Sequence, residues 1–260
     1  MSDIIIHRTP STSYSTDQIP VHNHGFIQLV DFMGSDLRIL QAARVSTGTA
    51  VSKGEEKDRR LIHYLMKNHH TSPFEMVEFL WHVRAPMFVA RQWVRHRICE
   101  WNEESGRYKE LRTDFFLPDT FRLQGTHHNA QKSDAAFDDT TNTRLREQYN
   151  NVFMDNKKCY QSTLEQNGAR ELARIALPLA TYTEWYWKVN GHALMNFLKL
   201  RCDRDHAQPE IADYADIMLD IFKQLMPITA EAFQTYILDT YSVSKTDWNE
   251  FQEFKSKNQD

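Results

Sequence analysis

In two segments of the sequence, residues of the kind usually buried in a protein core occupy every second position. This period of two constrains the fold more than any other feature. One segment runs through Val77, Phe79, Trp81 and Val83, and the other through Thr181, Thr183, Trp185, Trp187 and Val189. Successive side chains of a β-strand point to opposite faces of its sheet, so the alternation predicts two strands with one buried face each. Other elements must then cover that face.

Helical periodicity supplies those elements. Apolar residues three or four apart predict helices over Asp36 to about Val45, after the capping-box sequence Ser52–Glu55, and from Pro86 through Trp93 into residues 95–97. A long helix is predicted next, with Asn167–Gly168 as its stop and a buried stripe of Leu145, Tyr149, Val152, Phe153, Tyr160 and Leu164.

Three more helices are predicted: a short one over Arg170–Leu177, one capped by Asn190, and a last long one that begins at Pro209. Neither a repeat nor a linker interrupts the chain, which favours a single α+β domain over residues 1–260. Residues 125–144 are polar and nearly without period, so we predict a surface loop there, with His127 and His128 exposed rather than bound to a metal. Residues 1–24 are predicted to be an N-terminal extension without the features of a secretory signal.

Composition narrows the classes of function. With a net charge of −4 over 260 residues, the chain lacks the basic surplus of a general nucleic-acid binder, so no nucleic-acid partner is expected. No run of eighteen apolar residues occurs, so no membrane partner is expected either. The three widely spaced cysteines, Cys99, Cys159 and Cys202, favour reduced thiols in a cytoplasm over a disulfide framework or a zinc site. The sequence contains no Gly-x-Gly-x-x-Gly or P-loop, so side chains would have to hold the phosphates of any dinucleotide.

The densest cluster of chemically useful side chains lies between residues 92 and 108. Arg95, His96 and Arg97 are consecutive, and Asn102, Glu103, Ser105, Arg107 and Tyr108 follow them closely. Guanidinium groups bind phosphate through paired, charge-assisted hydrogen bonds, and Asn, Glu and Ser supply donors and acceptors for a sugar or a base. A surface loop with internal salt bridges would explain any single Arg–Glu pair, but the whole constellation favours a nucleotide site.

This segment resembles the signature of the flavin-dependent thymidylate synthases, an Arg-His-Arg triplet followed after seven residues by Ser. The longer pattern, Arg-His-Arg-x-x-Ser-x-Asn-Glu-x-Ser-x-Arg-Tyr, is matched at every fixed position but one, because Glu100 stands where Ser is usual. This departure puts an acid near the residues that bind phosphate in the family. The resemblance extends over most of residues 25–236, through the segments at 25–31, 42–46, 70–75, 170–174, 190–201 and 206–208.

The resemblance implies an α+β fold with a central, mostly antiparallel sheet flanked by helices. It also assigns site residues. The flavin contacts fall on Ser46, His70, Arg95, His96, Arg97, Glu103, Asn190 and Asn196. The nucleotide contacts fall on Gln92, Glu103, Ser105, Gly106, Arg107, Arg174 and Arg201, and no metal is implied.

The chemistry implied by the resemblance is the reductive methylation of dUMP to dTMP. FAD is the cofactor, methylenetetrahydrofolate donates the carbon, NADPH is the reductant, and the family works as a homotetramer with shared active sites. Arg201 is our candidate for the catalytic group, because a fixed guanidinium beside the uracil carbonyls would stabilise negative charge on the ring. For Ser105, the simpler role is to bind the phosphate through its hydroxyl and backbone amide, with Arg107 beside them. A role as nucleophile would need an activating base.

Two other functions are compatible with the residues. One is a regulatory module that binds the nucleotide without catalysis, a hypothesis to which Glu100 lends support. The other is a metal-dependent hydrolase that uses His69, His70, Glu75 and His206, although no His-Glu-x-x-His spacing is present. Binding of dUMP without flavin would indicate the first, and sensitivity of activity to a chelator would indicate the second.

Overall fold

Five strands form one antiparallel sheet in the computed structural model, which describes residues 17–46, 48, 54–125, 135–241 and 243–257. The strands are β1 (Ile19–Val21), β2 (Gly25–Met33), β3 (Glu78–Pro86), β4 (Glu100–Glu103) and β5 (Tyr182–Asn190), in the order β1-β2-β3-β5-β4. The two strands predicted from alternation, β3 and β5, pair along their whole length from Glu78 opposite Asn190 to Pro86 opposite Tyr182. The predicted antiparallel α+β fold is therefore confirmed.

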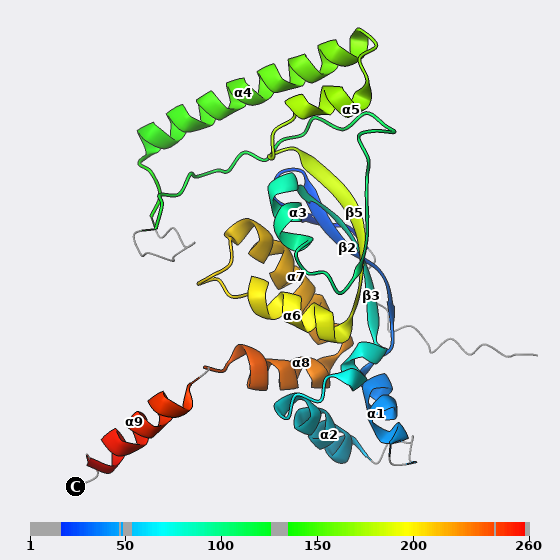
Figure 1. The fold of residues 1–260 in the computed structure, drawn as a ribbon, viewed down its shortest axis with the longest axis vertical. Helices are drawn as coiled ribbons and strands as arrows, with labels where there is room; N and C mark the ends of the chain where they lie inside the picture. Colours follow the sequence, from blue (N-terminus) through cyan, green and yellow to red (C-terminus); the bar gives the residue numbers. More distant parts are fainter. Residues whose placement is uncertain (1–16, 47, 49–53, 126–134, 242, 258–260) are drawn as a thin grey trace, which may run out of the picture.

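The alternating side chains of β3 and β5 give the sheet one buried face and one open face. Helices α3 (Met87–Trp93), α6 (Gly191–Arg201) and α7 (Pro209–Leu225) lie on one side of the sheet (Figure 1), where the strands direct Phe79, Trp81, Trp185 and Trp187. Trp93 of α3 joins this core and packs on Phe197, with 4.6 Å between the ring centroids. Burial of such large rings is the main source of stability, and it fixes α3 and α6 side by side at the sheet.

A second group of helices lies below the sheet in Figure 1: α1 (Asp36–Val45), α2 (Glu55–Lys67), the short helix η1 (Ser72–Met76) and α8 (Pro227–Phe233). Helices α1 and α2 are as predicted, and a buried ion pair between Arg44 and Asp58, 2.5 Å apart, joins them. Ser52 and Lys53 of the predicted capping box lie outside the described residues. The N-cap of α2 is Gly54, at φ 98°, a backbone conformation that glycine adopts without strain.

The structure corrects the prediction around the Arg-His-Arg triplet of residues 95–97. Helix α3 ends at Trp93, with Pro86 as its N-cap, so residues 95–97 follow the helix instead of continuing it. Residues 100–103, for which no strand was predicted, form the edge strand β4. Two glutamates and an asparagine in four residues carry no strand signal, and pairing with β5 creates the strand instead.

The prediction also fails for parts of the polar region and the long helix. Helix α4 (Asp139–Glu165) begins inside the predicted loop, because Asp138 caps it by accepting a hydrogen bond from the Thr141 amide at 2.9 Å. Residues 126–134, with His127 and His128, lie outside the described residues. Tyr149 and Val152 of the predicted buried stripe are 46% and 55% exposed, because α4 crosses the top of the molecule with cover on one side only (Figure 1).

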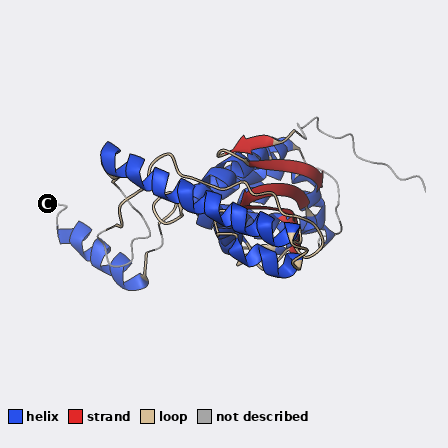
Figure 2. Ribbon diagram, turned by 90° about the horizontal axis from the view of Figure 1, so that it is seen from above, coloured by secondary structure: helices blue, strands red, loops and turns tan. Residues whose placement is uncertain are grey.

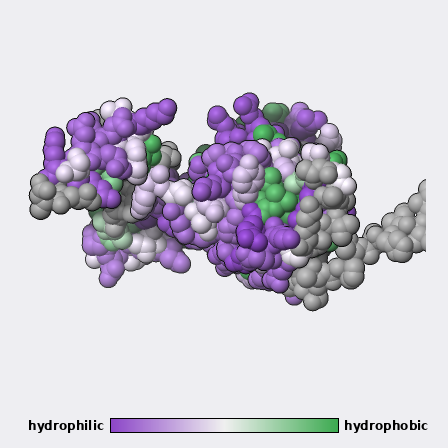
Figure 3. All heavy atoms as spheres, turned by 90° about the horizontal axis from the view of Figure 1, so that it is seen from below, coloured by the Kyte–Doolittle hydropathy of each residue, from purple (hydrophilic) through white to green (hydrophobic). Residues whose placement is uncertain are grey.

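Of the remaining helices, α6 and α7 begin where predicted, the one at 170–177 is shorter than predicted, and those after α7 were not predicted. Residues 170–177 form α5 (Arg170–Ala173) and the turn η2 (Arg174–Ala176), and α7 is followed by α8, a π-helical turn η3 (Gln234–Leu238) and α9 (Lys245–Lys257). Seen from above, the strands curve along one side of the molecule, and α9 projects from the body of the molecule (Figure 2). The surface seen from below is mostly hydrophilic, with a small apolar patch (Figure 3). No helix in the described ranges is long and apolar enough to cross a membrane.

Candidate active site

Arg201, the last residue of α6, is held by two residues around the end of α3. Its Nε donates to Nε2 of His96 at 3.1 Å, and its Nη2 donates to the backbone carbonyl of Gln92 at 3.4 Å. Burial, with the nearby charge of Arg201, lowers the pKa of His96 from 6.5 to about 4. His96 is therefore neutral at physiological pH, and a neutral imidazole accepts the hydrogen bond that orients the guanidinium.

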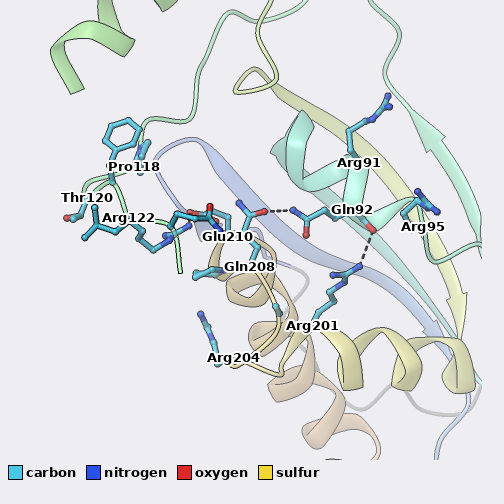
Figure 4. A pocket seen from close by; sticks show the side chains of 15 residues that line it. Arg91, Gln92, Arg95, Pro118, Thr120, Arg122, Arg201, Arg204, Gln208 and Glu210 are labelled. Carbon is cyan, nitrogen blue, oxygen red and sulfur yellow. Dashed lines mark hydrogen bonds and ion pairs between the residues drawn. The ribbon is translucent and has the colours of Figure 1, made fainter. Parts of the chain in front are cut away.

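A cavity of about 910 Å³ opens beside this cluster (Figure 4). Gln92, Arg95 and Arg201 line it, together with Arg91, Arg122, Arg204 and residues 118, 120–121, 123–124 and 207–210. Arg122 is paired with Glu210 at 2.6 Å, and Arg204 is paired with Asp213 and Asp216. Arg91, Arg95 and Arg201 make no ion pair within the part of the chain that the structure describes, so three cationic groups are free to bind an anionic ligand.

A second cavity, of about 550 Å³, contains another part of the predicted nucleotide site. Glu103, Gly106 and Arg174 line it, and Arg91 is the lining residue it shares with the first cavity. The carboxylate of Glu103 is fixed, because it accepts from the Thr183 hydroxyl at 2.6 Å and from the Trp101 indole at 3.2 Å. The rest of the lining is largely apolar: Met87, Ala90, Val94, Leu111, Ile175 and Leu179.

The turn between Ser105 and Arg107 requires its central glycine. A Cβ on Gly106 would lie 2.7 Å from Cδ1 of Leu111 and 3.2 Å from Cδ of Arg174, so no larger residue fits without displacing them. The Ser105 hydroxyl accepts from the Arg107 amide at 3.3 Å. Among the described residues, neither a histidine nor a carboxylate forms a hydrogen bond with Ser105, which leaves this hydroxyl without a base to activate it.

A third group of predicted residues lies around α1, α2 and α6, away from both large cavities. Asn190 is the N-cap of α6, as predicted, and its Oδ1 accepts from the Ala193 amide at 2.8 Å. Asn196 lines a small cavity of about 140 Å³ beside His69 and Thr71. His70 and Ser46 are exposed, at the ends of α2 and α1. Within one chain, the predicted site residues therefore fall into three separate groups.

Glu100, the one departure from the sequence signature, lies on the open face of the sheet. Its Oε2 is 3.7 Å from Nζ of Lys188, which also pairs with Glu78 at 3.1 Å. Neighbouring side chains of a strand alternate between faces, so Trp101 and Glu103 point to the opposite side of β4. Glu100 lines neither of the large cavities.

Sequence reasoning overlooked several residues that complete these cavities. Arg91, Thr183 and Glu210 had no assigned role, and Gln208 was noted only as part of a matched segment. The helical spacing of Arg91 and Arg95 is the one signal that places two cations on the same side of the chain. Within the described ranges, no group of three or more His, Cys, Asp or Glu residues could hold a metal ion, so the hydrolase alternative has no ligand set there.

Comparison with known proteins gives one consistent answer. The family described as thymidylate synthase complementing protein matches residues 28–228. A flavin-dependent thymidylate synthase of Thermotoga neapolitana is 47% identical over 219 residues, which cover 84% of this chain and 95% of the relative. One from Treponema denticola is 45% identical over 225 residues, which cover 84% and 82%. The crystal structure of the UMP/dUMP methylase PolB from Streptomyces cacaoi bound with 5-Br dUMP superposes with a TM-score of 0.77, at 35% identity, covering 85% of this chain and 99% of PolB.

The fold and the matched residues define the class of protein first: an α+β protein of the thymidylate synthase complementing type. The level of identity along the chain then defines the family. The chain belongs to the flavin-dependent thymidylate synthases.

Proposed function

We propose that the protein catalyses the reductive methylation of dUMP to dTMP, with methylenetetrahydrofolate as carbon donor and NADPH as reductant, through bound FAD. One observation carries the proposal: in a chain of this family, Arg201 is fixed by neutral His96 beside a cavity in which three guanidinium groups have no acidic partner among the residues that the structure describes. This arrangement suits an anionic nucleotide.

Arg201 is the catalytic residue of the proposed reaction. Its guanidinium would stabilise the negative charge that develops on the uracil ring as carbon 5 becomes nucleophilic. Because Nε of Arg201 is bound to His96, the guanidinium plane is set before the nucleotide arrives. The other proposed nucleotide ligands are Gln92, Glu103, Ser105, Gly106, Arg107 and Arg174.

The side chains around the triplet fit a flavin dinucleotide. Arg95 and Arg97 are exposed and have no ion pair among the described residues, so both can pair with a diphosphate. The further proposed FAD ligands are Ser46, His70, His96, Glu103, Asn190 and Asn196. When bound, FAD supplies the redox chemistry, and the chain supplies binding, orientation and charge.

We further propose that the protein is a homotetramer with shared active sites. The division of the site residues among three places in one chain supports this, because a second copy can bring one group against another. Apolar side chains beside the second cavity, Leu172, Ile175 and Leu179, are exposed in the single chain and suit such an interface. The unpaired thiols of Cys99, Cys159 and Cys202 are compatible with the proposed cytoplasmic location.

The visible spectrum of the purified protein tests the cofactor and the substrate together. We expect a flavin spectrum, or its appearance on addition of FAD, which NADPH bleaches at a rate that depends on dUMP. If excess FAD does not bind although dUMP does, the redox reaction is excluded and the regulatory alternative becomes the better account.

A further inference from the structure

The proposed phosphate ligands Ser105 and Arg107 lie on a turn that is closed by its own hydrogen bonds. The backbone amides of Tyr108 and Lys109 donate to the Ser105 carbonyl at 3.1 and 3.3 Å, and the Arg107 amide donates to the Ser105 hydroxyl at 3.3 Å. The side chain of Arg107 is exposed. These hydrogen bonds set the shape of the turn, but its place in the molecule depends on what holds its two ends.

A hydrogen bond at each end of the turn reaches another element of the fold. Before the turn, the Glu104 amide donates to the backbone carbonyl of Glu184 in β5 at 2.9 Å, which continues the pairing of β4 with β5. After the turn, the Leu111 amide donates to the hydroxyl of Tyr160 on α4, also at 2.9 Å. This second attachment depends on a single side chain, which lies 49 positions further along the chain.

Tyr160 also belongs to a small core that is separate from the main one. Leu111, Tyr160 and Ala173 are its buried members, and Tyr160 is 2% exposed. Helices α4 and α5, which carry Tyr160 and Ala173, lie together at the top of Figure 1. Arg174 follows Ala173 directly, and its Cδ is 3.2 Å from the place that a Cβ on Gly106 would occupy. The small core therefore holds the turn against Arg174, a further proposed ligand of the nucleotide.

We propose that Tyr160 is a positioning residue for the nucleotide phosphate, an inference that rests on the proposed function. Its hydroxyl holds the turn of residues 105–107 beside Arg174, so that the turn and the guanidinium meet the same phosphate. A phosphate gains most from several charge-assisted hydrogen bonds when their donors are already aimed at one point. Without the hydroxyl, the buried Leu111 amide loses its acceptor, and the turn is free to move away from Arg174.

Tyr160→Phe tests the proposal, because it keeps the buried ring and removes the hydroxyl alone. With the FAD-bound full chain, we expect KM for dUMP to rise about tenfold, the effect of one hydrogen bond whose buried donor is left unsatisfied. Because Arg201 lines the other large cavity, kcat at saturating dUMP should stay near the wild-type value. Tyr149→Phe, on the same helix at a position that is 46% exposed, is the matched control and should change neither constant.

Two further measurements show whether Tyr160 acts through the turn. Deoxyuridine lacks the phosphate, so its inhibition constant against dUMP should be the same in the wild type and in Tyr160→Phe. A general loosening of the site would weaken deoxyuridine as well. In a background with Ser105→Ala and Arg107→Ala, Tyr160→Phe should raise KM for dUMP by less than about twofold, because the ligands that it positions are absent.

A wild-type KM for dUMP in Tyr160→Phe would overturn the inference. Equal weakening of deoxyuridine would overturn it as well, and so would an undiminished rise in KM when the Ser105 hydroxyl and the Arg107 guanidinium are already missing. If the wild-type protein turns over dUMP, these results leave the proposed function intact. If the FAD-bound wild-type protein does not turn over dUMP, the proposed function fails and the inference fails with it.

Discussion

At the scale of single residues, the account depends on how Arg201 is held. A guanidinium at the end of a helix has many rotamers, and the hydrogen bonds to His96 and to the Gln92 carbonyl select one of them. Burial keeps His96 neutral. The neutral imidazole can therefore accept the hydrogen bond that the Arg201 cation donates. The chemistry attributed to Arg201 therefore requires both the charge and the orientation.

The first prediction concerns Arg201→Lys. Lysine keeps the positive charge but loses the planar group that donates to His96 and Gln92 at once. We expect kcat for dTMP formation to fall about 100-fold, on the scale of a lost transition-state donor, with the flavin spectrum retained. Steady-state kinetics with dUMP varied would test this, and a wild-type kcat in the lysine variant would remove Arg201 from the catalytic role.

The second prediction concerns pH. The pKa of His96 is 6.5 in the unfolded chain and about 4 in the folded protein, so between these values the unfolded chain binds a proton that the folded one does not. The free energy of unfolding should therefore decrease as the pH falls from 6.5 towards 4 and should be insensitive to this group above 6.5. His96→Gln should make the decrease smaller in urea titrations at pH 4.5 and 7.5. The exposed His69, changed to Asn, serves as the control, and identical profiles for wild type and His96→Gln would contradict the assignment.

At the scale of elements, α6 joins the fold to the site. Asn190 caps its first turn, and Arg201 stands at its end, so the helix carries a proposed flavin ligand and the proposed catalytic residue. The strand β5 before it is buried on the face that bears Trp185 and Trp187. Core packing of β5 thus fixes where α6 begins.

Asn190 provides the third prediction, because cap and ligand roles are separable. Asn190→Ala removes the cap and should lower stability by about 1 kcal/mol, which is roughly 3 °C in melting temperature for a chain of this size. Asn190→Ser keeps a capping oxygen and should melt like the wild type. FAD affinity should fall in both variants. If serine restores FAD binding as well as stability, Asn190 is a cap only.

The sequence predicted those elements whose patterns depend on burial. Alternating Trp and Val residues predicted β3 and β5, and the apolar faces of α1, α2, α6 and α7 predicted these helices, because one buried side imposes a period. The edge strand β4 was missed because its four residues take their conformation from pairing with β5. The exposure of Val152 was also missed, since a stripe pattern does not tell which part of a helix lies over the body of the molecule.

The candidate site residues were assigned by resemblance, and their grouping was not predicted. The sequence places Gln92 and Glu103 eleven positions apart, yet they line different cavities because α3 ends at Trp93 and the chain returns along β4. The partners that fix them, Gln208 and Thr183, lie far away in the sequence. Such pairings follow from topology, which a single sequence does not reveal.

At the scale of the whole molecule, the separation of the three residue groups is the main support for the proposed homotetramer. Ile175, 81% exposed beside the second cavity, belongs to the surface expected at a subunit contact. The fourth prediction is that Ile175→Glu lowers the oligomeric state measured by light scattering after size-exclusion chromatography and reduces dTMP formation at least tenfold, because a charge buried at an interface is costly. Tyr241→Glu, at a position near the C-terminal helix that is 96% exposed, should change neither.

An unchanged tetramer in Ile175→Glu would place the interface elsewhere, and full activity in a smaller assembly would contradict shared active sites. A wild-type protein that elutes as a monomer yet is active would contradict them too.

The most direct test of the central claim is product formation. Purified protein would be incubated with dUMP, methylenetetrahydrofolate and NADPH, with and without added FAD, and nucleotides would be separated chromatographically. The account predicts dTMP that accumulates over many turnovers, requires flavin and NADPH, and is abolished in Arg201→Ala. Absence of dTMP from a flavin-bound wild-type protein, or undiminished dTMP from Arg201→Ala, would contradict it.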